Sequence, residues 1–308
     1  MDISRALLAR GPALLALAVA LGLLLPPLAA LAREAMTVWV FVYVTGTFLR
    51  VDLSALRGAL RRPWLYLALP LLLMVALPLA ALHGLLALGL TGGLAMAAAF
   101  ALCAPPSSGN AAVARMLGSD ATLPFAVTLV CTAAVPWLVP LVSQALGQVA
   151  FSPWDLSWRL AGLLGSAVLV SVLLRGLAPR QVARHATHID LLVLWALAAF
   201  ALGAMADVQR RLLADPLDVL QVIALACAMN AACQLLGAAL ARPGERLGTA
   251  LVLGNRNVGL LWGAMGAGID PRIALYFAAA QLPIHLSPWL LQRVLRRGNG
   301  PAGAPQAR

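Results

Sequence analysis

The sequence predicts an all-α integral membrane protein of ten transmembrane helices, built as two inverted five-helix repeats with broken helices 4 and 9 crossing at the midplane. Hydrophobic residues make up 62% of the chain and charged residues 11%, against roughly 25% charged in soluble domains. The apolar runs are continuous rather than alternating, which indicates helices and not a β-barrel. Two polar interruptions, APPSSGN at 104–110 and GNRN at 254–257, occupy corresponding places in the two halves. A paired interruption of this kind is typical of a binding site at the interface between repeats.

Ten apolar runs are long enough to cross the hydrocarbon core, which takes about 20 helical residues. The expected spans are 12–31, 35–51, 64–82, 85–117 (broken), 121–146, 158–177, 189–206, 216–240, 247–267 (broken) and 271–294. Five spans per half is an odd number, so the second half enters the membrane from the opposite side. The expected domains are a first repeat over 1–150, an inverted repeat over 151–297 and a disordered cytoplasmic tail over 298–308.

The first run also resembles a signal peptide, because Arg5 and Arg10 precede the apolar residues 13–25. The apolar stretch continues to Leu31, however, which gives it the length of a retained span. We therefore favour a first transmembrane helix over a cleaved signal.

All 22 basic residues are Arg, and most lie between the apolar runs. Membrane topology explains them better than nucleic-acid binding, so no nucleic-acid partner is expected. With the N-terminus inside, 16 Arg residues fall on the inner side, five on the outer side and one within the membrane. This bias follows the positive-inside rule and predicts that both termini are cytoplasmic. The five outer residues are Arg33, Arg159, Arg210, Arg211 and Arg272.

The first interruption combines a helix break with oxygen and amide groups. Pro105 and Pro106 lack backbone donors and break the helical ladder, which frees carbonyls before them. Ser107, Ser108 and Gly109 then suit the start of a new half-helix that runs through Asn110 to Leu117. Free carbonyls and the Asn110 amide suit a hard cation, whereas the new helix start favours an anion. The alternative is a proline kink that only packs against its neighbours.

The second interruption places Asn255, Arg256 and Asn257 inside an apolar run. A charged residue near the bilayer centre costs about 2.5–3.5 kcal/mol on insertion scales, so Arg256 needs a partner. Two interpretations stay open. Arg256 pairs internally with a carboxylate or with helix-end carbonyls, or it contacts an anionic substrate or serves in coupling.

The last span adds polar groups. Gln281 and His285 lie on one face at i, i+4, and they either extend the cavity or form interhelical hydrogen bonds. Gly259, Gly263 and Gly266 are interpreted as helix-packing contacts. The four Cys residues lie in apolar runs without metal-ligand spacing, and no metal site is expected. The sequence contains no phosphate-binding glycine loop, metalloprotease motif or serine nucleophile motif, so we expect neither an enzyme nor a bound cofactor.

The segments APPSSGNAAVARMLGSDATLPFAVTL, LVLGNRNVGL and AQLPIHLSPWLL together resemble the bile acid:sodium symporter family, which belongs to a wider group with auxin-efflux-type and arsenite-efflux carriers. The first two spans fit as well. The resemblance implies a ten-helix inverted repeat with a panel domain and a core domain, and sodium-driven uptake of organic anions. It places Asn110 on the family's crossover Asn, Thr128 on a hydroxyl ligand once one insertion is allowed, and Asn257 on an Asn that faces the substrate cavity.

The sequence departs from the family at the sodium ligands. Gly109 stands where a ligating Ser is usual, Val252 replaces a carboxylate shared by both sodium sites, and Arg256 replaces a Gln ligand. At about 5 Å and an effective dielectric constant of about 20, the Arg256 charge would repel sodium by roughly 3 kcal/mol, or more than a hundredfold in affinity. We therefore expect transport that is sodium-independent or proton-linked.

Taken together, the sequence predicts a secondary carrier for a small organic anion in a bacterial inner membrane. The expected substrate-binding residues are Asn110, Arg256, Asn257, Asn255, His285 and Gln281, and the expected ion-binding residues are Ser107, Ser108, Asn110 and Thr128. The alternatives are a carrier that exports an oxyanion or a drug-like solute, and a non-transporting membrane sensor with the same fold. The substrate, the coupling ion, the direction of transport and the oligomeric state are not predicted.

Overall fold

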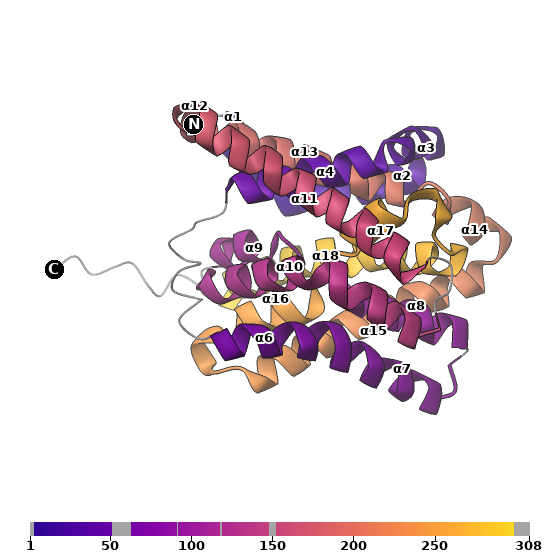
Figure 1. Ribbon diagram of the computed structural model, residues 1–308. Coiled ribbons are helices and arrows are strands. Elements are labelled where there is room, and N and C mark those ends of the chain that lie inside the picture. Colours follow the sequence, from indigo (N-terminus) through magenta and orange to yellow (C-terminus); the bar gives the residue numbers. More distant parts are fainter. Residues whose placement is uncertain (1–2, 51–62, 91, 118, 148–151, 299–308) are drawn as a thin grey trace.

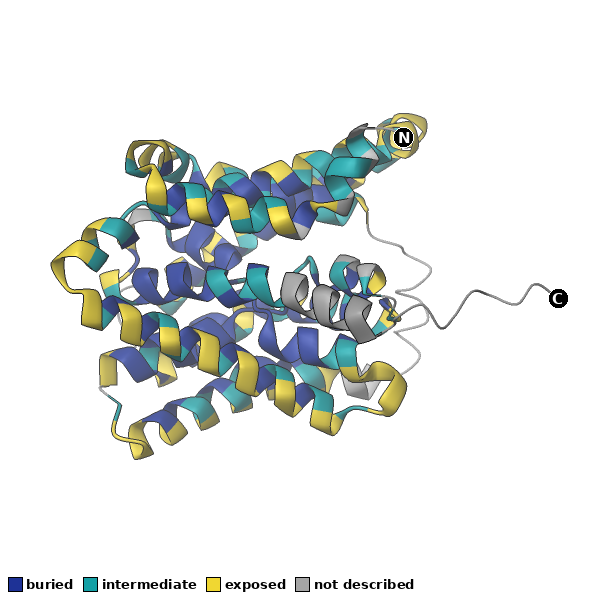
Figure 2. Ribbon diagram, turned by 180° about the vertical axis from the view of Figure 1, so that it is seen from behind, coloured by how far each residue is buried: buried dark blue, intermediate teal, exposed yellow. Residues whose placement is uncertain are grey.

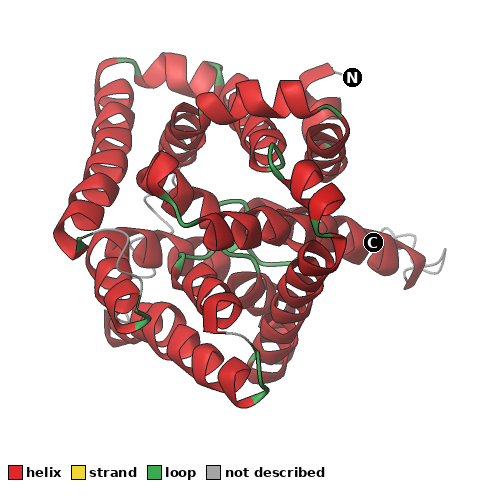
Figure 3. Ribbon diagram, turned by 90° about the vertical axis from the view of Figure 1, so that its right-hand side faces the viewer, coloured by secondary structure: helices red, strands yellow, loops and turns green. Residues whose placement is uncertain are grey.

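The computed structural model describes residues 3–50, 63–90, 92–117, 119–147 and 152–298. The described residues form helices joined by short connections, with one isolated β-bridge and no strand (Figure 3). Four features expected from the sequence lie outside them, namely Arg57, Arg61, Arg62 and the tail after residue 298.

Within the described residues, five helices are long and apolar enough to cross a membrane, and a bent pair would make a sixth. Their outward faces carry large apolar side chains, such as Leu177 at 82% exposed and Leu213 at 80% (Figure 2). Water does not favour such a surface, whereas lipid does. The described part of the chain is all-α, and its helices fit a multi-pass membrane protein. The five helices cover Leu67–Ala87, Thr122–Ala145, Pro153–Leu177, Ala186–Ala214 and Pro216–Leu240.

The helices pack as two bundles (Figure 1). The smaller bundle consists of α2 (Gly11–Leu24), α3 (Pro26–Glu34), α4 (Met36–Leu49), α11 (Pro153–Leu177) and α13 (Ala186–Ala204). The larger bundle consists of α6 (Pro63–Leu71), η1 (Leu72–Ala76), α7 (Leu77–Ala87), α8 (Gly92–Cys103), α9 (Asn110–Met116), α10 (Thr122–Ala145), α15 (Pro216–Leu240), α16 (Arg246–Gly254), α17 (Val258–Met265) and α18 (Pro271–Gly298). Short helices complete the chain: α1 (Ile3–Ala9), α12 (Pro179–Arg184), α14 (Val208–Ala214), η2 (Pro243–Glu245) and η3 (Gly266–Gly268).

Three helices of the larger bundle, α10, α17 and α18, form the boundary between the bundles. Of these, α17 contacts α4 and α11 of the smaller bundle on one side and α18 on the other. Its glycines permit the close approach, because a Cβ on Gly263 would lie 2.9 Å from Val40 and one on Gly259 would lie 2.8 Å from Phe200. Both glycines are therefore packing contacts, as expected. Gly266 is not, because a Cβ there would have no neighbour within 4 Å, and its φ of +60 makes it a turn glycine.

Charged residues gather at the two ends of the bundles. At one end, where α3 and α14 lie, Arg33 pairs with Asp207, and Arg272 pairs with Asp218 at 2.6 Å. At the opposite end, near α12, Arg50 pairs with Asp190 at 2.9 Å (Figure 1). Arg33 and Arg272, which are expected on the same side of the membrane, thus lie at the opposite end of the bundles from Arg50, which is expected on the other side.

The first expected span is not one straight helix. The structure divides 12–31 into α2 and α3, which are bent by 111°. Leu25 between them has φ −124 and ψ 72. The cause is Pro26 and Pro27, because proline disfavours the helical conformation in the residue before it and lacks a backbone donor.

The boundary between the third and fourth spans was also misplaced. His83 and Gly84, expected to form the loop, lie inside α7, which continues to Ala87. The chain turns instead at Gly89, whose φ of +80 suits glycine, and α8 begins at Gly92.

The repeated Gly-x-Asp sequences have the same local role in both halves. Asp120 accepts hydrogen bonds from Thr122 N at 2.9 Å and Thr122 Oγ1 at 2.8 Å where α10 begins. Asp270 accepts one from Arg272 N at 2.7 Å where α18 begins. The Thr122 hydrogen bonds lower the pKa of the Asp120 carboxyl below its ordinary value, because they stabilise the ionised form.

Candidate functional site

The two polar interruptions meet as a pair of broken helices. One break separates α8 from α9 and the other separates α16 from α17. An antiparallel bridge joins Pro106 to Arg256. Ser107 N donates to Asn255 O at 2.8 Å, and Asn257 N donates to Pro105 O at 2.8 Å. Unwound backbone buried in a membrane protein needs such partners. Here each break satisfies the other, and we call residues 104–109 and 255–257 the crossover.

Asn110 holds the two breaks together. It is 1% exposed, and its Nδ2 donates to Leu251 O at 3.0 Å and to Asn255 O at 3.3 Å. Asn110 therefore links α9 to α16, because its side-chain amide donates hydrogen bonds to carbonyls of the other broken helix.

A network of side-chain hydrogen bonds joins α15 and α18 to the crossover. Asn230 Nδ2 donates to Gly254 O at 2.8 Å and to Asn255 Oδ1 at 3.1 Å. Gln234 Nε2 donates to Asn255 Oδ1 at 3.3 Å and to Ser287 Oγ at 3.1 Å. Asn230 and Gln234 were not predicted as site residues. Their spacing at i, i+4 within the apolar run of α15 is the signal that would have found them.

Arg256 lies at the C-terminal ends of both broken helices. Its Nε donates to Leu253 O in the last turn of α16 at 3.1 Å, and its Nη1 donates to Ala104 O just after α8 at 3.4 Å. The side chain is 3% exposed, and none of the ion pairs among the described residues includes it. Of the partners considered for Arg256, the structure shows helix-end carbonyls.

At this position the positive charge of Arg256 is balanced by the dipoles of two helices. Each helix C-terminus carries about half a negative charge, so two that converge supply about one. The guanidinium therefore neutralises α8 and α16 without a carboxylate. Its Nη2 is buried without a hydrogen-bond partner. Arg256 also lines a cavity of about 30 Å³, the interior cavity, together with Asn230 and Tyr276. That volume is enough for one water molecule.

Asn257 faces the other way, towards the smaller bundle. Successive residues of an extended segment point to opposite sides, which separates Asn257 from Arg256. Asn257 Oδ1 accepts from Leu260 N at 3.3 Å, capping α17, and from Tyr43 Oη on α4 at 2.8 Å. Tyr43 was not predicted as a site residue.

A second cavity of about 30 Å³, the crossover cavity, lies between the bundles beside Asn257. Ser108 and Thr128 line it, as do Thr47 and Thr132. Thr128 Oγ1 is buried without a hydrogen-bond partner. The structure thus brings together Ser108, Thr128 and Asn257 at the crossover cavity. Ser107 belongs instead to the backbone of the crossover, with its Oγ 3.4 Å from Gly109 N.

Gln281 and His285 pair with each other. His285 Nε2 lies 3.1 Å from Gln281 Oε1, and Gln281 Nε2 donates to Phe277 O at 3.2 Å. Both are buried in α18, and neither lines the interior cavity nor the crossover cavity. The hydrogen bonds of these two side chains thus stay within α18 and do not include the other candidate residues.

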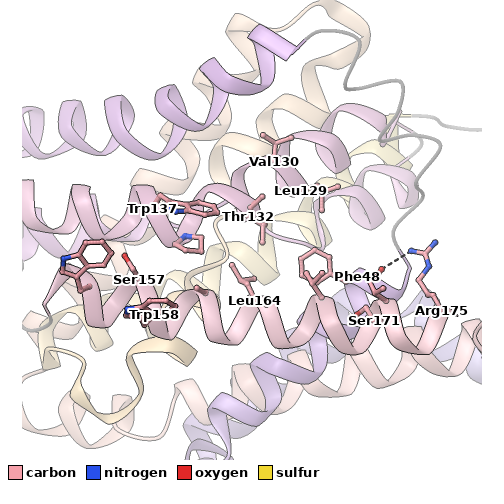
Figure 4. Close-up of a pocket in the computed structure, with 17 residues that line it drawn as sticks. Phe48, Leu129, Val130, Thr132, Trp137, Ser157, Trp158, Leu164, Ser171 and Arg175 are labelled. Carbon is pink, nitrogen blue, oxygen red and sulfur yellow. Dashed lines mark hydrogen bonds between the residues drawn. The ribbon is translucent and has the colours of Figure 1, made fainter. Parts of the chain in front are cut away.

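An apolar groove of about 810 Å³ extends from the crossover cavity between α10 and α11 (Figure 4). Phe48, Leu129 and Thr132 line both spaces. Among the described residues, no group of three or more His, Cys, Asp or Glu side chains is placed to hold a metal ion. No family model matches the sequence, and no curated protein matches it.

Proposed function

We propose that the protein is a secondary transporter that moves a small organic anion by alternating access. The observation that carries this proposal is the crossover, where two broken helices meet between two bundles and leave an unpartnered hydroxyl on Thr128 beside Asn257. Transporters built from repeats place their substrate at such discontinuous helices and move one bundle against the other.

The inverted repeat is part of the proposal. The broken helices, the Asp residues at the starts of α10 and α18, and the paired Pro-Trp-Leu sequences all recur about half a chain apart. The division into two bundles supports the panel and core domains that the bile acid:sodium symporter family implies. We therefore propose a distant relationship to that family, ten spans, and a place in a bacterial inner membrane with both termini in the cytoplasm.

In this proposal Arg256 acts as a tethered cation. A mobile sodium ion would be stabilised at the same two helix ends, and the guanidinium already occupies that position. Asn257, Ser108 and Thr128 face the cavity between the bundles and bind the substrate. Arg256 serves the substrate indirectly, by holding the crossover closed without sodium.

A ligand screen followed by a flux measurement tests the function. Binding raises thermal stability by mass action, so purified protein is screened against small organic anions in sodium and in potassium buffers. The best ligand is then radiolabelled, and its uptake into proteoliposomes is measured. Accumulation inside supports a carrier, and movement only outward supports the export alternative. Binding without flux would make the protein a sensor and overturn the proposal.

A further inference from the structure

The two bundles pack closely together at the end where α3 and α14 lie (Figure 1). There Arg33 of α3 lies over the ring of Trp262 on α17, with its Cζ 5.6 Å from the ring centroid. Phe200 of the smaller bundle packs edge-on against the same indole, with ring centroids 6.2 Å apart. The cavity that Arg33, Asp207 and Trp262 line measures about 10 Å³, which is at the lower limit for one water molecule. This space is too small for a solute.

This packing lies on one side of the hydrogen bond between Tyr43 and Asn257, and the crossover cavity lies on the other. Along α4, Thr37 precedes Tyr43 by about 9 Å at 1.5 Å per residue. Its Oγ1 donates to Gly263 O of α17 at 3.1 Å. Thr47 follows Tyr43 on α4 and lines the crossover cavity. In this structure the crossover cavity is therefore closed towards α3 and joined to the groove between α10 and α11.

Asp207 holds Arg33 in its position over the indole. The Asp207 carboxylate accepts hydrogen bonds from Arg33 Nη1 and from Arg210 Nη2, the latter at 3.2 Å. The Arg210 side chain is 80% exposed, and of these two arginines Arg33 is the one that contacts Trp262. Arg33 lies in the smaller bundle, and Asp207 follows α13 of the same bundle. The ion pair can therefore stay intact when the bundles separate, and the contact that breaks is the one with Trp262.

We propose that Arg33 and Trp262 form a gate that closes the path to the crossover cavity at the α3 end. The inference rests on the proposed function, because a gate has a role only where two bundles alternate access to a site. In the closed state the indole fills the space between the bundles and the guanidinium covers it. In the open state Trp262 moves away with α17, and Arg33 remains paired with Asp207. A single cation–π contact is weak enough to break and form again in each transport cycle.

Cysteine labelling measures how often this end opens. Val40 lies between Thr37 and Tyr43 on α4 and is 0% exposed, so Val40→Cys should react when the bundles separate here. The reagent is N-ethylmaleimide, which is uncharged, and the sample is the purified full-length protein in detergent. Every variant also carries Cys227→Ser, because Cys227 is exposed, and the protein without Val40→Cys gives the background from the three buried cysteines. Thr47→Cys reports the side of the crossover cavity.

The gate variants are compared with a control that changes charge equally. Arg33→Gln removes the cation–π contact, and Arg210→Gln also removes one positive charge and one hydrogen bond to Asp207. Arg33→Lys keeps a cation at the gate. We expect Arg33→Gln to raise the labelling rate of Val40→Cys about two- to fivefold, as for the loss of one cation–π contact. Arg33→Lys and Arg210→Gln should stay near the rate of the parent protein, and labelling of Thr47→Cys should not rise.

Three results would overturn the gate. The first is an unchanged rate at Val40→Cys in Arg33→Gln, and the second is an equal rise in Arg210→Gln. The third is a rise at both Val40→Cys and Thr47→Cys, because that would show a loosened fold. The labelling needs neither substrate nor flux. A failed flux measurement would therefore contradict the proposed function, whereas a failed labelling measurement would contradict the gate.

Discussion

Tyr43 on α4 donates a hydrogen bond to Asn257 at the crossover, with 2.8 Å between Tyr43 Oη and Asn257 Oδ1. This bond joins the two bundles at the edge of the crossover cavity. The Tyr43 ring is buried against Phe200, with ring centroids 6.3 Å apart. Asn257 therefore caps α17, binds the smaller bundle and borders the proposed substrate position at once.

Tyr43→Phe should weaken the contact between the bundles with little effect on folding. A hydrogen bond between transmembrane helices contributes about 0.6 kcal/mol on average, so the loss of stability should be about that size. Because Asn257 then loses a partner beside the substrate, the KM for uptake should change as well. Expressed as a free energy, that change should be larger than the loss of folding stability. Ser143→Ala is the control, since that buried hydroxyl donates to Pro140 O within α10. Identical uptake kinetics in wild type and Tyr43→Phe would count against a role for Asn257 at the substrate.

Gly263→Ala should separate α17 from α4. The new methyl group would lie 2.9 Å from Val40, closer than van der Waals contact, and overpacking typically costs about 1–3 kcal/mol. Transport should slow as well, because this boundary must move during alternating access. Gly162→Ala has open space around its Cβ and should be neutral or slightly stabilising. Thermal unfolding and initial uptake rates check both variants. Normal uptake and stability in Gly263→Ala would contradict the packing argument.

Thr128→Val should reduce substrate affinity without harming the fold. The Thr128 hydroxyl has no protein partner, so removing it leaves no hydrogen bond broken in the free protein. A substrate that uses this hydroxyl should bind about fivefold more weakly, from the loss of roughly 1 kcal/mol. Thr45→Val is a matched control, because Thr45 Oγ1 is also buried and unpartnered but does not line the crossover cavity. Equal affinities for the two variants would remove Thr128 from the site.

Arg256→Gln should make the protein sensitive to sodium. Loss of the guanidinium leaves two helix C-termini without a counter-charge and takes a donor from the carbonyls of Leu253 and Ala104. This should destabilise the fold by about 1–3 kcal/mol. Added sodium should restore part of that stability and leave the wild type unchanged. The measurement is a sodium titration of the thermal midpoint, with choline as the ionic-strength control. A variant that matches the wild type in stability and ignores sodium would show that Arg256 does not compensate the helix ends.

The composition of the chain was enough to predict its class, and the paired interruptions were enough to predict the crossover. Continuous apolar runs have one physical solution in lipid, which is the helix. Pro105, Pro106 and the polar triplet around Arg256 mark the broken helices directly. In an unbroken transmembrane helix, the prolines would remove backbone hydrogen bonds and the triplet would place polar groups in lipid. The structure confirms that both helices break, and it places the breaks side by side.

The sequence did not predict the directions in which the side chains of the crossover point. Arg256 and Asn257 are neighbours in the chain, yet they face opposite sides of the crossover, and only the pairing with Pro106 decides which side is which. The bend at Pro26 and the continuous helix through Gly84 also depend on competing local signals that a single sequence does not rank. Tyr43 and Asn230 were missed because each sits in an apolar run as an ordinary packing residue would, and their partners lie far along the chain.

If Arg256 occupies the position of a bound cation, uptake of the substrate does not need sodium. Once the ligand screen has identified an anion, its uptake is measured in proteoliposomes of the wild-type protein with all sodium replaced by choline. We expect the same initial rate with sodium and with choline, because the Arg256 guanidinium already stabilises α8 and α16. Uptake that depends strictly on sodium would contradict it.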